Sequence, residues 1–316
     1  MKVTVGVDLG GTHMQIGVVN AACEIIGRSG TKTEASRGSA AILDTIAEHV
    51  RIALDRAGMK RADAVGLAAP GAIDPERGIV LNAPNLKWDD LPAADELARR
   101  LDMPVVLDND VNAAVFAEQR MGAGVGCNDL LGIWIGTGVG GGLVLRGEVY
   151  HGPRRTAGEI GHVLIDPDNP KGRRELEHQC SRTAIARDIC EAIENGEPSV
   201  LASAIKEGSP CTSSLIAGAL DQQDALTRRI VNLAGEKIGR VAGSLVTLLS
   251  LECIVVGGGL VEEAGEHIVR PIQEAARASC WPEELRGVEV RATKLGANAG
   301  LLGTAILAAA RTGQGV

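Results

Sequence analysis

Three glycine clusters in the sequence have the composition of loops that bind phosphate. They are Gly10-Gly11-Thr12, Gly136-Thr137-Gly138 and Gly257-Gly258-Gly259, and each follows an apolar run that is typical of a strand. Because glycine lacks a Cβ, backbone N–H groups in such turns can approach a phosphate closely, and the two threonines add hydroxyl donors. A single cluster of this kind is more often only a tight hairpin, but three in similar settings favour phosphate binding.

Two aspartates stand where a carboxylate could act on a bound phosphate. Asp8 lies near the end of the first expected strand and could hold Mg²⁺ through water. Asp110 follows the apolar run 104–107 and precedes an expected helix. That position suits a base that accepts the proton of a hydroxyl group during phosphoryl transfer. Two alternatives stay open, because Asp110 could instead cap the helix and Asp108 could be the base.

A duplicated α/β framework is expected to carry these residues. The pattern of strand, glycine turn with threonine, and strand occurs at 3–19 and again at 130–145. Two lobes that each present such a hairpin to a shared cleft follow the logic of the actin-like ATPases, which have the ribonuclease H-like fold. We expect a small lobe of residues 1–115, joined by a returning C-terminal helix at 298–316, and a large lobe of residues 116–297. The other expected elements are strands at 24–33, 64–69, 104–107, 254–256 and 288–292, and helices at 39–57, 182–194, 222–249, 262–278 and 298–310.

Composition excludes several classes of protein. The 316 residues suit two α/β lobes, and 45% of them are hydrophobic and 23% charged, as in globular proteins. Three Trp, one Tyr and one Phe leave little for stacking on single-stranded nucleic acid. A net charge of -8 without a long basic run argues against nucleic acid or an anionic membrane as partner. The seven scattered cysteines, the absence of a leader and the lack of an apolar run of about 20 residues predict a cytoplasmic protein.

Other nucleotide-binding motifs fit the sequence poorly. The run Gly138-Val139-Gly140-Gly141-Gly142 resembles a dinucleotide loop, but Leu143-Val144-Leu145 continues as a strand where a helix should begin. Neither the Walker lysine motif nor the signature set of the protein kinases occurs. A dehydrogenase and a protein kinase are therefore rejected.

At these motifs the chain resembles the ROK family of sugar kinases, especially the bacterial glucokinases, nearly from end to end. The resemblance is carried by Asp8 to Thr12, Ala69-Pro70-Gly71, Pro84-Asn85-Leu86, Asn109 to Ala114, Gly136 to Gly142, Gly158-Glu159-Ile160-Gly161-His162 and Gly257-Gly258-Gly259. It implies that Asp110 is the catalytic base. It further implies sugar contacts from Gly71, Asn85, Asn109, Glu159, His162 and Glu177, and contacts to ATP from Gly10, Gly11, Thr12, Thr137, Gly138, Gly257 and Gly258.

The acidic and histidine residues of this set suit a sugar. Polyols need carboxylate acceptors and an adaptable donor or acceptor, which Glu159, Glu177 and His162 can supply. An isolated histidine is more often a satisfied, half-buried side chain, but the place of His162 in Gly158–His162 favours a role in binding. Four of the five other histidines, His49, His151, His178 and His267, are expected to be surface or capping residues.

The sequence departs from the family at a zinc site. ROK kinases typically hold zinc through the histidine that matches His162 and three cysteines, but Asp168, Pro170 and Glu175 stand at the cysteine positions. One histidine without thiolates cannot form a closed tetrahedral site, so we predict that no zinc binds here. A substitute site formed by His162, Asp168, Glu175 and His178 is conceivable, but a charged solvated loop is favoured. What orders residues 166–177 stays open.

The function expected from the resemblance is an ATP- and Mg²⁺-dependent hexose kinase that acts on the 6-hydroxyl of glucose. Variants of this function would use polyphosphate as donor, or fructose, N-acetylmannosamine or another hexose as acceptor. The acidic balance argues weakly against polyphosphate. A sugar-sensing ROK regulator is disfavoured because the first strand begins at once after Lys2, and a silent scaffold is disfavoured by the intact Asn109-Asp110 pair. The resemblance also implies a homodimer or homotetramer.

Overall fold

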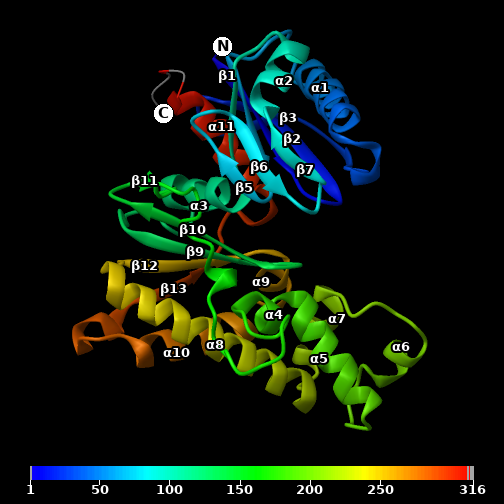
Figure 1. Ribbon diagram of the computed structural model, residues 1–316, viewed down its shortest axis with the longest axis vertical. Helices are drawn as coiled ribbons and strands as arrows, with labels where there is room; N and C mark the ends of the chain where they lie inside the picture. The colour runs from blue at the N-terminus through cyan, green and yellow to red at the C-terminus, as the bar shows by residue number, and fades with distance from the viewer. Residues whose placement is uncertain (1, 312, 314–316) are drawn as a thin grey trace. The chain divides into compact units, whose positions relative to one another are not determined.

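Two compact units make up the chain in the computed structural model, which describes residues 2–311 and 313 (Figure 1). Unit 1 comprises Met1–Glu118, His151–Thr156 and Asn298–Val316, and unit 2 comprises Gln119–Tyr150 and Ala157–Ala297. The boundary between residues 115 and 116, which the sequence predicts for the two lobes, stays a prediction. Residues 1, 312 and 314–316 of the expected small lobe lie outside the described residues. Short segments far apart in the sequence therefore belong to one unit.

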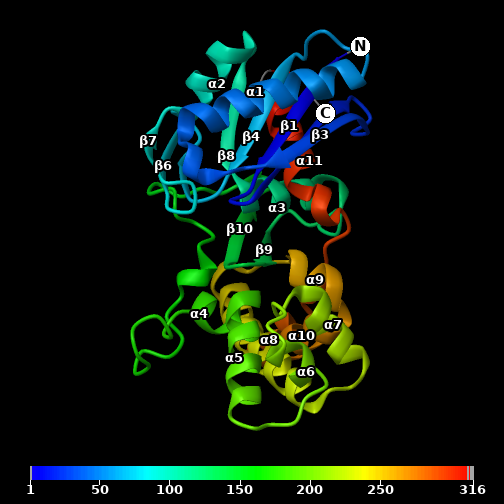
Figure 2. The same ribbon diagram turned by 90° about the vertical axis from the view of Figure 1, so that its right-hand side faces the viewer.

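Unit 1 is built on a five-stranded sheet with the order β3-β2-β1-β4-β8. Strand β1 pairs antiparallel with β2 and parallel with β4, which in turn pairs parallel with β8. Helix α11 packs on one face of this sheet, and α1 and α2 cover the other (Figure 2). The bounds are β1 Val3–Leu9, β2 His13–Asn20, β3 Ile25–Lys32, β4 Ala64–Ala69, β8 Val105–Asn109, α1 Ser39–Arg56, α2 Ala93–Leu101, α3 Asp110–Met121 and α11 Ala299–Arg311.

Glycine lets α11 lie directly against the sheet. A Cβ at Gly6 in β1 would overlap the carbonyl oxygen of Leu301, and one at Gly66 in β4 would overlap that of Thr304. Such close packing between elements is possible only where one partner has no side chain. The β-branched and leucine side chains of β1, β4 and β8 fill the remaining core with those of α1 and α2.

A second, three-stranded sheet in unit 1 was not expected from the sequence. It has the order β5-β6-β7, with β5 at Ala72–Asp74, β6 at Ile79–Ala83 and β7 at Trp88–Leu91. The strands are antiparallel, and only every second residue or so is buried. The turn between β6 and β7 carries Asn85, one of the expected sugar ligands.

Unit 2 repeats the sheet of unit 1. Its five strands have the order β11-β10-β9-β12-β13, with β9 antiparallel to β10 and parallel to β12, and β12 parallel to β13. The pairing therefore matches that of β3-β2-β1-β4-β8 strand for strand, except that β11 is shorter than β3. The bounds are β9 Leu130–Ile135, β10 Val139–Leu145, β11 Glu148–Val149, β12 Cys253–Gly257 and β13 Glu289–Ala292. The duplication expected from the sequence is confirmed.

Helices complete unit 2. They are α4 Leu176–Cys180, α5 Arg182–Glu194, α6 Ala202–Lys206, α7 Ser213–Asp221, α8 Ala225–Leu249, α9 Gly259–Ala264 and α10 Glu266–Ser279. Gly239 and Gly243 of α8 let α10 approach so closely that a Cβ at either would overlap a carbonyl oxygen of α10. The single helix expected at 262–278 is wrong, because Gly265 has φ +50° and separates α9 from α10. In the described part of the chain, every helix is too short or too polar to cross a membrane.

Candidate active site

The first glycine hairpin, between β1 and β2, is held by its own backbone and by Thr33. Gly10 N donates to His13 O at 3.0 Å, Thr33 N donates to Thr12 O at 2.9 Å, and Thr33 Oγ1 donates to Gly10 O at 2.6 Å. The turn residues Gly11 and Thr12 are exposed. A Cβ at Gly11 would lie 3.6 Å from the Cβ of Asn85, so the structure brings this expected sugar ligand beside the hairpin.

Asp8 and Asp110 are two half-buried carboxylates whose charges interact, and Asp8 lies in β1, two residues before Gly10 of this hairpin. Burial, and secondly the charge of Asp110, raise the pKa of Asp8 to about 7. Burial also raises the pKa of Asp110 above its ordinary value of 3.8, although hydrogen bonds from backbone N–H groups lower it. A Cβ at Gly300 would lie 2.7 Å from Asp8 Oδ2, so α11 also approaches Asp8 closely. Among residues 2–311 and 313, neither carboxylate has an ion-pair partner, and this arrangement fits a bound Mg²⁺.

Asn109, more than Asp110, caps α3. Asn109 Oδ1 accepts hydrogen bonds from Val111 N at 2.9 Å and Asn112 N at 3.0 Å, while Asp110 Oδ1 accepts one from Val111 N at 2.9 Å. An N-cap side chain bonds to the second or third N–H of the helix, and Asn109 fills that role. The carboxylate of Asp110, at the first helical position, is therefore not required as the cap.

Gly71 joins this group through Asn109. Asn109 Nδ2 donates to Gly71 O at 3.1 Å, and Gly71 has φ +98°, a conformation that strongly favours glycine. Both ends of the Asn109 amide are thus engaged inside unit 1, which leaves one N–H for a ligand. Unit 1 brings together all of its predicted members of the site: Asp8, Gly10, Gly11, Thr12, Gly71, Asn85, Asn109 and Asp110.

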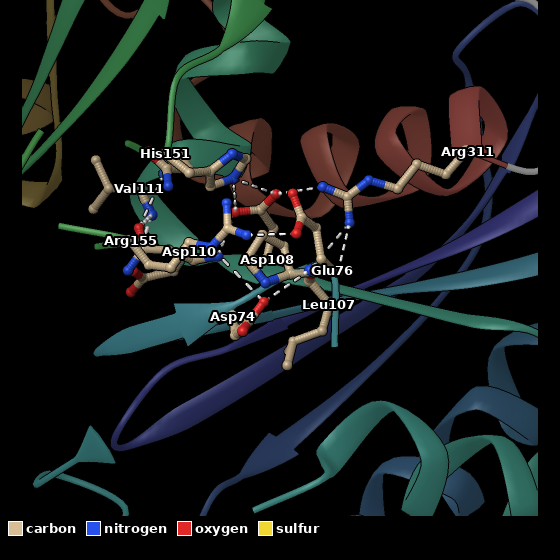
Figure 3. Close-up of polar contacts among 12 residues, drawn as sticks. Asp74, Glu76, Leu107, Asp108, Asp110, Val111, His151, Arg155 and Arg311 are labelled. Carbon is tan, nitrogen blue, oxygen red and sulfur yellow. Dashed lines mark hydrogen bonds and ion pairs between the residues drawn. The ribbon is translucent and has the colours of Figure 1, made fainter. Parts of the chain in front are cut away.

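Asp108 is unsuited to be the base. Its side chain is 1% exposed, and its oxygens lie 2.9 and 3.0 Å from His151 Nε2, with Arg311 Nη2 at 3.2 Å (Figure 3). Because both oxygens already accept hydrogen bonds from basic side chains, Asp108 is not available to a substrate hydroxyl. The expectation that His151 is a surface or capping residue is wrong, because its ring bonds to a buried carboxylate.

The second glycine hairpin, between β9 and β10, contacts Glu177. Gly136 N donates to Gly138 O at 2.9 Å, and Val139 N donates to Glu177 Oε2 at 2.9 Å. A Cβ at Gly138 would overlap that same oxygen. Glu177, on α4, therefore already holds the hairpin with one oxygen and keeps the other for a ligand.

Arg182 also lies at this hairpin, and the sequence analysis missed it. Its N–H donates to Gly136 O at 2.9 Å, and its guanidinium Nη2 donates to Thr137 Oγ1 at 3.3 Å. A positive side chain at a glycine turn is what a phosphate site needs. The available signal was the helix start at 181–182, where Ser181 caps α5 and places Arg182 at its first position.

His162 lies among three glutamates of unit 2. Its Nδ1 is 3.0 Å from Glu175 Oε2, and this hydrogen bond is the main cause that raises the pKa of His162, with the charges of Glu159, Glu175 and Glu177 adding to it. Glu159, His162 and Glu177, the predicted sugar-recognition set, are thus near one another. Gly161 makes this possible, because a Cβ there would overlap Val139 O of the hairpin strand.

The segment that carries zinc ligands in typical relatives is held by protein contacts here. Leu164 and Glu175 form an isolated antiparallel bridge, Ile165 N donates to Arg174 O at 3.0 Å, and Leu176 N donates to Val163 O at 3.0 Å. Within the described residues, no group of three or more His, Cys, Asp or Glu side chains is arranged to hold a metal ion. The prediction that no zinc binds stays a prediction.

The third glycine cluster ends β12 and lies beside the second hairpin. Gly258 has φ +90°, and a Cβ there would lie 2.8 Å from the backbone of Ile135, the last residue of β9. Helix α9 begins at the next residue, with Val261 N and Glu262 N donating to Gly258 O. Unit 2 therefore brings its own predicted members together at the ends of β9 and β12.

Comparisons with known proteins agree with this architecture. The glucokinase of Halalkalibacterium halodurans is 35% identical over 306 residues, which are 95% of this chain and 92% of that protein. The glucokinase of Thermotoga maritima is 32% identical over 314 residues and 98% of each chain. A solved ROK family glucokinase from Streptomyces griseus, in complex with glucose and AMPPNP, is 32% identical and covers 97% of this chain and 99% of its own, with a TM-score of 0.85.

The duplicated sheets with their glycine hairpins define the actin-like ATPase fold, which the structural relatives share. The profile of the ROK family matches residues 4–311. The chain belongs to the ROK family, as the motifs predicted.

Proposed function

We propose that this protein is an ATP-dependent hexose kinase that transfers the γ-phosphoryl group to the 6-hydroxyl of glucose. The observation that supports this most is the pair Asp8 and Asp110, two half-buried carboxylates without an ionic partner in the described residues, of which Asp8 directly precedes a glycine hairpin. The relatives named glucokinase, at 35% and 32% identity over nearly the whole chain, support glucose as the acceptor.

In the proposed reaction, Asp110 is the general base. Its carboxylate accepts the proton of the sugar hydroxyl as the hydroxyl oxygen bonds to the γ-phosphorus, while the bond from that phosphorus to its bridging oxygen breaks and leaves ADP. Burial raises the pKa of Asp110, which makes the carboxylate a stronger proton acceptor than an exposed one. Asn109 fixes Asp110 by capping the helix on whose first turn it lies.

The residues of unit 2 are proposed to select the sugar. Glu159, His162 and the free oxygen of Glu177 supply acceptors and a donor for hydroxyl groups. Because Glu177 also bonds to Val139 N, a sugar bound there would be coupled to the hairpin that is proposed to hold the phosphates. Glu175 is proposed to orient His162 in place of the zinc of typical relatives.

The glycine clusters of both units are proposed to bind the nucleotide. Gly10, Gly11, Thr12, Thr137, Gly138, Gly257 and Gly258 are proposed to contact ATP, and Arg182 to contact a phosphate. Asp8 is proposed to bind Mg²⁺ through water, and Mg²⁺ would neutralise phosphate charge. All seven cysteines are free thiols, which supports a cytoplasmic enzyme. A homodimer or homotetramer is proposed from the family.

An ADP-release assay over a panel of hexoses tests this function. The protein is incubated with Mg-ATP and glucose, mannose, fructose or N-acetylmannosamine, and in a second series ATP is replaced by polyphosphate and the sugar phosphate is measured. We expect kcat/KM to be highest for glucose with ATP. Higher kcat/KM with another hexose or with polyphosphate would assign a variant of the kinase, and no phosphorylation of any sugar would overturn the proposal.

A further inference from the structure

Asp108 is a buried carboxylate next to the proposed base, and it is not itself free to react. It is the fourth residue of β8, and its side chain is 1% exposed. Asp108 Oδ1 accepts a hydrogen bond from Asn109 N at 2.8 Å. The carboxylate thus holds the backbone directly before Asp110.

Two basic side chains from distant parts of the chain hold Asp108 in turn. His151 Nε2 lies 2.9 Å from Oδ1 and 3.0 Å from Oδ2, and Arg311 Nη2 donates to Oδ2 at 3.2 Å. Figure 3 shows the His151 ring and the Arg311 guanidinium on either side of the Asp108 carboxylate. Arg311 Nη1 also donates to Leu107 O at 3.4 Å, so it contacts the strand as well as the carboxylate.

The segment that carries His151 is anchored at a second point. Arg155 Nη2 pairs with Glu76 Oε2 at 2.6 Å, and Arg155 Nε lies 3.8 Å from Asp74 Oδ1. Asp74 Oδ1 in turn accepts hydrogen bonds from two backbone N–H groups of the turn that follows β5. Residues 151–156 are therefore fixed to unit 1 at both ends, and the His151 ring has a defined place.

We propose that Asp108, clamped by His151 and Arg311, is a positioning residue that aims Asp110 through Asn109. This inference rests on the proposed role of Asp110 as the base. Asp108 fixes the N–H of Asn109, and Asn109 caps the first turn of α3, where Asp110 lies. If one basic partner is lost, the buried carboxylate is left partly unpaired and turns toward water, which shifts Asn109. A displacement of about 1 Å at a reacting group is enough to lower turnover about 100-fold.

The expected effect is on kcat with little change in KM. His151→Ala should lower kcat about 10- to 100-fold and change the KM for glucose less than about threefold, because the sugar contacts remain. His151→Gln should recover most of the loss, because its amide nitrogen can donate to Asp108 from a similar distance. His267→Ala is the matched control, since His267 pairs with a carboxylate, Asp221, at 3.3 Å on the surface of unit 2.

A chemical rescue separates the lost hydrogen bond from a general loss of structure. A cavity of about 380 Å³ is lined by Pro75, Glu76, His151, Arg155 and Arg311, so a small molecule can reach the place of the missing ring. Added imidazole should raise the kcat of His151→Ala at least about threefold and leave the wild type and His267→Ala unchanged.

A double-mutant cycle with Asp110→Asn distinguishes this inference from the proposed function. A wild type without sugar kinase activity, or an Asp110→Asn variant with wild-type turnover, contradicts the proposed function. If Asp110→Asn has a lowered kcat, adding His151→Ala should lower kcat by less than a further factor of about two, because His151 acts through Asp110. The positioning role is overturned if His151→Ala has the kcat of the wild type. It is also overturned if His151→Ala lowers kcat by the same factor in the Asp110→Asn background as in the wild type. Should His151→Ala fail to fold, Arg311→Met carries the same cycle, as the Arg311 side chain is 35% exposed at the last position of α11.

Discussion

Replacing Gly138 by alanine should break the contact between Glu177 and the second glycine hairpin. The added Cβ would overlap Glu177 Oε2 and lie 3.0 Å from its carboxylate carbon. Because this carboxylate is the end of a flexible side chain, it can move while the hairpin backbone stays. The hydrogen bond from Val139 N to Glu177 Oε2, 2.9 Å long, is then lost.

The size of the effect follows from the charge on that acceptor. A hydrogen bond to a charged group contributes about 1.5–3 kcal/mol, so Gly138→Ala should lower the free energy of unfolding by about 2 kcal/mol. For a protein of 316 residues, that corresponds to a fall in Tm of roughly 3 °C. Since Glu177 is also a proposed sugar ligand, kcat/KM for glucose should fall about 10- to 100-fold.

Gly136→Ala is the matched control in the same hairpin. No heavy atom of the described residues, apart from its chain neighbours, lies within 4 Å of a Cβ at Gly136. It should therefore change the free energy of unfolding by less than about 0.5 kcal/mol. Thermal melts and steady-state kinetics of the three proteins decide the matter. An equal loss of stability from the two substitutions, or wild-type stability and activity of Gly138→Ala, would refute the reasoning.

Two further predictions concern pH. Since the pKa of Asp8 is raised from 3.8 to about 7, ionisation of Asp8 destabilises the fold as pH rises through that range. In metal-free urea unfolding, the free energy of unfolding of Asp8→Asn should therefore rise by about 2–4 kcal/mol relative to that of the wild type between pH 4 and pH 8. A difference between the two proteins that does not change with pH would contradict this. The hydrogen bond between Glu175 and His162 lowers the pKa of Glu175 and raises that of His162. The pair should therefore stabilise the fold most between pH 4.5 and pH 6.5, the ordinary pKa values of the two groups, and less as pH rises through the folded pKa of His162. The Tm difference between the wild type and Glu175→Gln should peak in that window, and a difference that grows toward pH 9 would count against the pair.

The sheets and hairpins could be predicted because they are encoded locally. Apolar runs that end in glycine and threonine mark β1–β2 and β9–β10, and the pattern occurs twice. The small sheet β5-β6-β7 escaped prediction because its strands have three to five residues and alternate only in part between buried and exposed side chains. The break between α9 and α10 depends on one glycine at positive φ within an otherwise helical pattern.

Members of the candidate site could be named from motifs, but their partners could not. His151 and Arg311 lie 43 and 203 residues from Asp108, and no local spacing indicates such contacts. The sequence indicates Glu175 as a residue at a missing cysteine position and as a member of a conceivable substitute metal site, whereas its carboxylate forms a hydrogen bond with His162. The sequence could not decide between Asn109 and Asp110 as the cap of α3, because the choice depends on the direction of the side chains. In the structure Asn109 is the cap.

The most direct test of the account is the rate of phosphoryl transfer by Asp110→Asn. Single-turnover transfer from Mg-ATP to glucose, measured beside glucose affinity for the variant and the wild type, separates chemistry from binding. The account predicts a rate lower by about 1,000-fold or more with glucose affinity within about tenfold, because the amide keeps a hydrogen bond but cannot accept the proton. A rate near that of the wild type would contradict it.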